Sequence, residues 1–300
     1  MKLLSVFVLD VLLLAAWLPG LAQPARAQQR MDELLGADRA YSKAAAAKAN
    51  VIDALTPMFS ADVIMPGPGG VFAHGPQEAA KALSANPDNV TAHASWTPIG
   101  GGISADGTQG FTYGYMTVTR PDRTTVPAKY MSYWVKTAAG WRVAAYKRTR
   151  RPEGRGSEER APLLPDTMVP PVTIASTLAA NDASLAAAEK SFSDDAQTMG
   201  LGPAFVKYGA SDAVNMGSDA TFLVGNDTIG AFVGGAAPQA ASPVRWASDE
   251  KVIVASSGDL GVSIGLIRPN APAPDGSTPP PGAFFTIWRK VNGVWKYVAE

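Results

Sequence analysis

The feature that most constrains this 300-residue chain is a hairpin pattern that occurs twice, about 150 residues apart. Each copy has two tryptophans seven residues apart, a lysine two residues after the first tryptophan and a cation directly after the second. A glycine lies between the tryptophans, and in the second copy it forms the pair Asn292-Gly293. Both residues of such a pair accept the positive φ of a tight hairpin turn. The pattern therefore predicts a β-hairpin at 133–143 and another at 287–297.

The repetition extends through both halves of the chain. Residues correspond at a spacing that stays between about 149 and 154. Corresponding pairs include Tyr41 and Phe192, Phe59 and Tyr208, Asp62 and Asp212, Trp96 and Trp246, and Gly110 and Gly261. A constant spacing over so many positions indicates a duplicated domain. We expect the two copies to pack face to face as a pseudo-symmetric pair that imitates a two-fold dimer.

Helical spacing comes first in each copy, and alternating strand patterns follow. Proline and glycine clusters separate these elements, since proline removes a donor and glycine opens a turn. In the first half we expect helices at 31–49, 51–59 and 76–83, short strands at 62–65 and 71–73, and a meander of strands at 91–103, 110–119, 127–137 and 141–148. This order predicts an α+β fold with helices on one face of an antiparallel sheet.

Composition limits the classes of partner and cofactor. The chain has 26 Lys plus Arg and 26 Asp plus Glu, so no net field favours nucleic acid or an anionic membrane. It has no cysteine, which excludes disulfides, thiolate nucleophiles and cysteine-bound zinc. Two histidines do not make a metal site, and no glycine-rich phosphate loop is present. We therefore expect no metal and no cofactor.

The N-terminus has the form of an export signal. An apolar run follows Lys2, and Ala25-Arg26-Ala27 matches a signal-peptidase site, so we expect cleavage after Ala27 and a periplasmic location. The alternative is an uncleaved membrane anchor, since the run is nearly long enough to span a bilayer. We assign 1–27 to the signal, 28–148 and 177–300 to the two domains, and 149–176, rich in proline and charge, to a linker. A basic nucleic-acid patch at 147–151 is an alternative that nearby glutamates dilute.

At this point the residues resemble a family. The helix pair, Asp62 before a short strand, Gly75 before the third helix, the mid-sheet Trp96 and the closing Trp-x-Lys and Gly-Trp-Arg hairpin are similar to SnoaL-like and ketosteroid isomerase-like domains of the nuclear transport factor 2-like superfamily. The resemblance covers nearly all of 31–148 and 180–300. It implies two cone-shaped, cystatin-like α+β barrels, in which a curved sheet wraps a long helix and leaves a pocket at the open end. Members include isomerases, polyketide cyclases, dehydratases and pocketed proteins without a known reaction, so the fold does not transfer a function.

Comparison of the two halves suggests where a polar ligand would bind. Tyr113 and Tyr115 share one face of a strand, and their counterparts are the aliphatic Ile264 and Leu266. Both histidines also lie in the first half. We therefore predict a pocket in the first domain for a small, largely apolar molecule, lined by Tyr41, Phe59, His93, Trp96, Tyr113 and Tyr115. The alternative is that the tyrosines lie on the outer sheet face or at the contact between the domains.

Acid–base chemistry has two candidates, His74 and Asp62. Imidazole titrates near neutral pH, but His74 precedes a proline helix start, where a surface turn residue is common. Asp62 lies where a helix gives way to a strand, a position that favours a capping aspartate. The leading hypothesis is an exported pocket protein without an identifiable catalytic set. The alternatives are an isomerase, cyclase or dehydratase acting in the first domain, and a scaffold whose outer sheet faces bind another protein.

Overall fold

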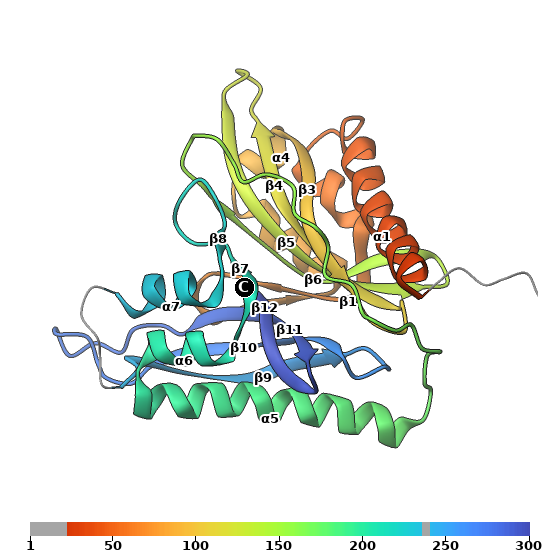
Figure 1. Ribbon diagram of the computed structural model, residues 1–300. Coiled ribbons are helices and arrows are strands. Elements are labelled where there is room, and N and C mark those ends of the chain that lie inside the picture. The colour runs from red at the N-terminus through yellow and green to blue at the C-terminus, as the bar shows by residue number, and fades with distance from the viewer. Residues whose placement is uncertain (1–22, 236–240) are drawn as a thin grey trace, which may run out of the picture.

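The computed structural model describes residues 23–235 and 241–300 and contains two six-stranded sheets, each covered by helices (Figure 1). The strand order is β2-β1-β6-β5-β4-β3 in the first sheet and β8-β7-β12-β11-β10-β9 in the second. The two orders are identical after a shift of six strands, as a duplication requires. Both sheets are mixed, curved and open instead of forming a closed barrel. The predicted α+β fold is confirmed, but the prediction of a wholly antiparallel sheet is wrong, because β1 pairs in parallel with β6 and β7 with β12.

The first domain begins with a long helix that starts eight residues before the predicted position. Its elements are α1 (Gln23–Ala45), α2 (Val51–Leu55), η1 (Thr56–Met58), β1 (Phe59–Pro66), η2 (Pro68–Gly70), β2 (Phe72–His74), α3 (Gly75–Ser84), α4 (Asp88–Thr91), β3 (His93–Ile103), β4 (Gln109–Thr119), β5 (Thr125–Thr137) and β6 (Gly140–Arg150). The short α4 was not expected from the sequence. It is tied to α3 by Asn89, whose side-chain amide donates to the carbonyl of Leu83 at 2.6 Å.

The second domain repeats this order with fewer short helices. Its elements are α5 (Ala175–Met199), α6 (Leu201–Tyr208), β7 (Gly209–Asn215), β8 (Leu223–Val224), α7 (Asn226–Gly234), β9 (Val244–Val254), β10 (Leu260–Pro269), β11 (Gly282–Val291) and β12 (Val294–Ala299). The long helices α1 and α5 lie on the outer sides of the molecule, and the two sheets meet between them (Figure 1).

Both predicted hairpins are present and close the two sheets in the same way. β5 and β6 pair antiparallel up to Thr137 and Gly140, and β11 and β12 pair up to Val291 and Val294. In the second turn Asn292 has φ 51° and Gly293 φ 78°, the left-handed conformation that a tight turn needs. In each domain the last strand of the hairpin then pairs in parallel with the first strand of the same domain.

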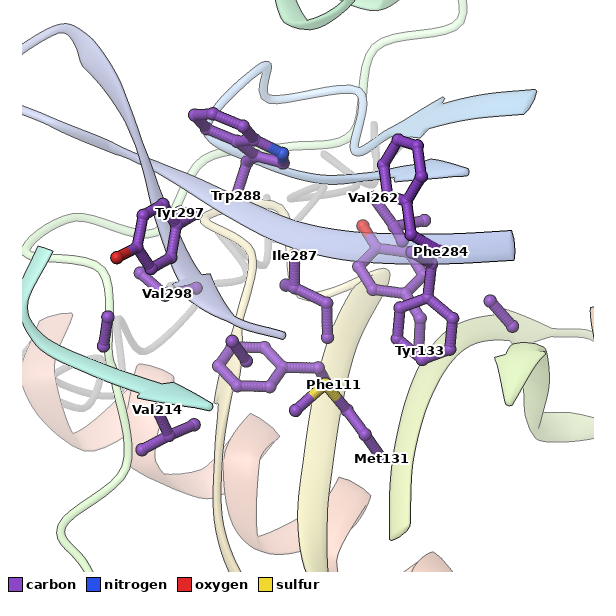
Figure 2. Close-up of a cluster of buried hydrophobic side chains, with 14 of the residues drawn as sticks. Phe111, Met131, Tyr133, Val214, Val262, Phe284, Ile287, Trp288, Tyr297 and Val298 are labelled. Atoms are coloured by element: carbon purple, nitrogen blue, oxygen red, sulfur yellow. The ribbon is translucent and has the colours of Figure 1, made fainter. Parts of the chain in front are cut away.

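The two domains contact each other through the outer faces of their sheets. Figure 2 shows the centre of this contact, where side chains of β4 and β5 lie against those of β10 and β11. The buried residues there include Phe111, Met131 and Tyr133 of the first domain and Val262, Ile264, Phe285 and Ile287 of the second. The faces that the scaffold hypothesis would offer to another protein are therefore largely covered by each other.

Polar groups fix the position of the two domains relative to each other. Asp106 accepts the backbone N–H of Ser257 at 3.0 Å, and Asp259 accepts the backbone N–H of Ala105 at 3.0 Å. The two turns thus hold each other reciprocally. Nearby, the buried Lys129 ammonium donates to backbone carbonyls in the 216–221 loop of the second domain, at 2.8 and 3.0 Å for two of them. Charge-assisted hydrogen bonds of this kind offset the cost of burying the lysine.

The segment between the domains, 151–174, follows the outer edge of the first sheet. The backbone N–H of Arg160 donates to the carbonyl of Ile99 at 2.7 Å, and that of Leu163 donates to Gly101 at 2.9 Å. The N–H of Ile103 donates in return to the carbonyl of Leu163 at 3.2 Å. Edge strands carry unpaired backbone groups that invite association, so this segment protects the β3 edge.

The predicted export signal falls mainly on residues 1–22, which lie outside the described residues. Gln23 to Ala27 form the first turn and a half of α1, and the side chain of Ala27 is buried. Within 23–235 and 241–300, no helix is both long and apolar enough to cross a membrane.

Candidate functional site

A buried acid lies at the centre of the second domain. Glu189 is on the inner face of α5, four residues after Leu185 and three before Phe192, and only 1 % of it is exposed. The indole N–H of Trp246 donates to Glu189 Oε1 at 2.6 Å, and that of Trp288 donates to Oε2 at 3.0 Å. The hydroxyl of Ser263 also donates to Oε2. Burial raises the pKa of the Glu189 carboxyl to about 7, although these donors oppose the rise.

The first domain has the same arrangement at the equivalent position. Asp38 on α1 is fully buried, and its Oδ1 accepts the indole N–H of Trp96 at 2.6 Å. The hydroxyl of Tyr130 donates to Oδ2 at 2.8 Å. Burial raises the pKa of this carboxyl as well. Neither acid was predicted as a site residue, although each lies among the apolar residues on the buried face of a long helix.

A cavity of the second domain lies close to its buried acid, Glu189. Trp246 separates them, since its indole donates to Glu189 and also lines the cavity. The cavity has a volume of about 220 Å³. It is lined by Phe192, Leu201, Phe205, Asn215, Val233, Val244, Trp246, Ile267, Phe284, Thr286 and Glu300. Most of these side chains are aromatic or aliphatic, as in sites for small molecules.

The polar groups of this cavity are few. Asn215 Nδ2 lies 3.3 Å from Glu300 Oε2, to which it donates. Burial raises the pKa of the Glu300 carboxyl, and the positive charge of Lys147 across the domain contact opposes the rise. Thr286 adds a hydroxyl from the neighbouring strand. These three groups can hold one polar substituent of a ligand that is otherwise apolar.

The equivalent positions in the first domain carry different side chains. Strand registers place Tyr130 where the second domain has Phe284, and Met116 where it has Ile267. Tyr146 corresponds in the same way to Glu300, and its hydroxyl lies 3.9 Å from Met116 Sδ. All three first-domain side chains are buried in one continuous cluster. At two of these positions, Tyr130 and Tyr146, the first domain has a bulkier side chain than the second.

Three of the predicted site residues belong to this first core. Trp96 donates to the buried acid as described, and the Phe59 ring packs on the Tyr146 ring with centroids 5.7 Å apart. Tyr41 stacks on Trp134 at a centroid distance of 6.1 Å, and its hydroxyl accepts from Arg142 Nη1 at 2.6 Å. These aromatic side chains pack against protein groups on the sides that were expected to face a ligand.

The other tyrosines point to the opposite face of the sheet. The rings of Tyr113 and Tyr115 pack edge-on against Phe222 of the second domain, with centroid distances of 5.1 and 5.5 Å. The hydroxyl of Tyr115 also lies 3.0 Å from Ser157 Oγ. Both tyrosines thus lie at the contact between the domains. This position was the alternative to a ligand pocket when the sequence alone was considered. The predicted set is divided between two faces of one sheet.

The histidines and Asp62 lie on the surface. The His74 side chain is 54 % exposed, and its Nε2 lies 3.5 Å from Glu250 Oε1 of the second domain. Asp62 is exposed and accepts the hydroxyl of Ser60 at 2.8 Å. His93 is exposed as well, with Nδ1 3.0 Å from the carbonyl of Lys48. Across the described ranges, no cluster of three or more His, Asp or Glu side chains could hold a metal ion.

Both halves of the chain have the same order of helices and strands, with helices packed on a curved, mixed sheet. No family model and no curated protein matches the sequence. Similar solved structures include an NTF-2-like protein from Shewanella oneidensis (12 % identity, 40 % of this chain and 97 % of that chain, TM-score 0.29). Others are an NTF2-like protein with a cystatin-like fold from Novosphingobium aromaticivorans (15 %, 42 % and 82 %, 0.28) and a ketosteroid isomerase-like protein from Erwinia carotovora atroseptica (19 %, 42 % and 94 %, 0.27).

Proposed function

We propose that this protein binds a small, largely apolar molecule in the cavity of the second domain. The observation that carries the proposal is a hollow of about 220 Å³ walled by four aromatic side chains, with Glu300 where the first domain has the ring of Tyr146. An apolar protein cavity of about 150 Å³ is large enough for benzene. The cavity therefore suits a single ring with a short substituent. Asn215, Thr286 and Glu300 would orient one hydroxyl or amine of that ligand.

The arrangement favours binding over catalysis. Both oxygens of Glu189 already accept hydrogen bonds from protein donors, and Glu189 is not among the residues that line the cavity, whereas its partner Trp246 is. Glu189 therefore acts on a ligand only by positioning Trp246. The acid–base candidates from the sequence, His74 and Asp62, do not line this cavity. An isomerase, cyclase or dehydratase reaction in this cavity would have to use Glu300, whose carboxyl lines it and accepts a hydrogen bond from Asn215.

The test compares two phenylalanine substitutions on the same strand. Val244 lines the cavity, and Val252 lies further along β9 without lining it; both are half-buried. Val244→Phe should fill the cavity, whereas Val252→Phe adds the same bulk elsewhere. We expect toluene, phenol and benzyl alcohol to bind the full chain in calorimetry and ligand-observed NMR. Val244→Phe should weaken that binding by at least about tenfold and Val252→Phe should leave it unchanged.

Two outcomes would overturn the proposal. One is that none of the three probes binds the unmodified protein at millimolar concentration. The other is that Val244→Phe binds them as well as Val252→Phe does. The melting temperature of each variant with and without probe shows whether the variants are folded.

We also propose that the chain is exported and cleaved after Ala27. The apolar run behind Lys2 and the Ala25-Arg26-Ala27 pattern support this proposal. Expression of the full chain in a bacterium should yield a periplasmic product whose measured mass starts at Gln28. The double variant Ala25→Arg, Ala27→Arg should accumulate uncleaved. A full-length, cytoplasmic product of the unmodified chain would contradict both cleavage and export.

A further inference from the structure

A second cavity of about 510 Å³ lies between the two domains, apart from the one inside the second domain. The outer face of the first sheet forms one wall with Phe111 and Tyr113, and Leu163 of the interdomain segment forms another. The second domain closes it with β7 and β12, which contribute Asp212 and Val214 among others. None of these side chains lines the second-domain cavity described above.

Two opposite charges line this interdomain cavity from different domains. Arg160 comes from the interdomain segment, and Asp212 comes from β7. Within residues 23–235 and 241–300, neither side chain forms an ion pair with another. Glu159, the other charged lining residue, is instead paired with Arg39 and is 68 % exposed. The cavity therefore has one cation and one anion whose charges are available to a ligand.

A buried hydroxyl lies near both charges. Tyr113 is only 4 % exposed and lines the cavity. Burial raises the pKa of its phenol to about 12, with Arg160 opposing the rise and Asp212 adding to it. The phenol is therefore protonated at neutral pH and serves as a hydrogen-bond donor. Tyr113, Arg160 and Asp212 all line the same cavity.

Neighbouring strands fix the backbone at Arg160 and near Asp212. The N–H of Arg160 donates to the carbonyl of Ile99 at 2.7 Å, three residues before Leu163 joins the same strand edge. Asp212 lies within β7, whose following residues pair with β8 and β12. A cation and an anion that line one cavity favour a ligand that carries both charges.

We propose that the interdomain cavity binds a small zwitterion of the α-amino acid class. Arg160 and the Tyr113 hydroxyl hold its carboxylate, and Asp212 holds its ammonium. Phe111, Leu163 and Val214 supply an apolar surface for an aliphatic side chain. A simple anion would leave Asp212 without a counter-charge beside it, and a simple cation would do the same to Arg160. A zwitterion compensates both charges at once.

Three probes of similar shape separate these cases. Leucine carries both charges, 4-methylpentanoate lacks the ammonium, and 3-methylbutylamine lacks the carboxylate. We expect calorimetry and ligand-observed NMR with the full chain to show leucine binding at least about tenfold more tightly than either of the others, as expected for loss of a charge-assisted hydrogen bond.

Matched variants assign the two charges. Arg160→Gln and Asp212→Asn should each weaken leucine binding by about tenfold or more. Arg155→Gln and Asp62→Asn are the controls, because Arg155 is 86 % exposed in another ion pair and Asp62 is the first-domain counterpart of Asp212. Both controls should bind leucine normally.

The results that would overturn the inference are specific. They are equal affinity for all three probes, unchanged leucine affinity in Arg160→Gln and Asp212→Asn, or no leucine binding at 10 mM, which is about the weakest affinity that the assay registers. The Val244→Phe variant keeps the interdomain cavity and should bind leucine normally. Its behaviour distinguishes this proposal from the one for the second-domain cavity.

Discussion

The buried Glu189 should make the stability of the second domain depend on pH in a calculable way. Its pKa rises from the usual 4.5 to about 7 in the folded protein. Between pH 4.5 and about 7, the Glu189 carboxyl is therefore protonated in the folded state and ionised in the unfolded state. Stability is fully present below pH 4.5 and falls as pH rises, until the loss is complete above about pH 7. The variant Glu189→Gln stays neutral throughout and should lack this loss.

The size of the effect follows from the width of the interval. Each pH unit over which only the folded state is protonated changes the free energy of unfolding by about 1.4 kcal/mol. An interval from 4.5 to about 7 then corresponds to about 3 kcal/mol. Glu189→Gln should be less stable than the unmodified protein at pH 5, since an amide cannot accept from both Trp246 and Trp288. At pH 8 this difference should shrink by about 3 kcal/mol.

Urea unfolding followed by tryptophan fluorescence at pH 5, 6, 7 and 8 measures this difference. Other carboxyls, including Asp38, are present in both proteins and cancel in the comparison. Glu158→Gln is the control, because the Glu158 side chain is 82 % exposed and should not alter the pH dependence. If the unmodified protein and Glu189→Gln lose equal stability between pH 5 and pH 8, Glu189 does not titrate as a buried acid and the reasoning is refuted.

Three further substitutions test the packing. Lys129→Met removes the ammonium that donates to backbone carbonyls of the second domain. The free energy of unfolding in urea should fall by about 3 kcal/mol. An unchanged free energy of unfolding would refute the role of Lys129 in holding the domains together. Gly265→Ala places a Cβ against the carbonyl oxygen of Ala247 and should cost about 2 kcal/mol or more, whereas Gly282→Ala, with its nearest neighbour 3.9 Å away, should be nearly neutral. Tyr146→Ala should lower the free energy of unfolding by about 3 to 5 kcal/mol and leave a cavity in the first core. Ligand-observed NMR should then detect toluene binding to this variant. Absence of toluene binding would show that the core collapses around the missing ring.

Local signals were sufficient for most of the fold. Tryptophan spacing and the Asn292-Gly293 pair act within a few residues, so the hairpins and the repeated order of elements along the chain could be predicted, but the strand order within each sheet could not. The boundaries were less accurate where tertiary contacts decide them. The helix Asp88–Thr91 was missed because it depends on the contact of Asn89 with Leu83, which no local pattern contains.

The site was harder to predict because alternation does not say which face is inside. It correctly placed Phe111, Tyr113 and Tyr115 on one face of β4. The choice between the inner and outer face depends on Phe222, which lies more than a hundred residues away and packs against both tyrosines. A cavity is similarly invisible in sequence, because it results from the sizes of side chains on several strands.

The difference between the two cores centres on one phenol. The tyrosines predicted to bind a ligand in the first copy did not include Tyr130, whose hydroxyl donates to the buried Asp38. In the second copy Phe284 has no hydroxyl, and Trp288 and Ser263 satisfy Glu189 from the side of the sheet. The buried acid thus has its donors in both copies, while the ring that supplies a donor in the first copy also fills its core. A polar residue present in only one copy of a duplicated fold therefore indicates a ligand only after its partner inside the protein has been excluded.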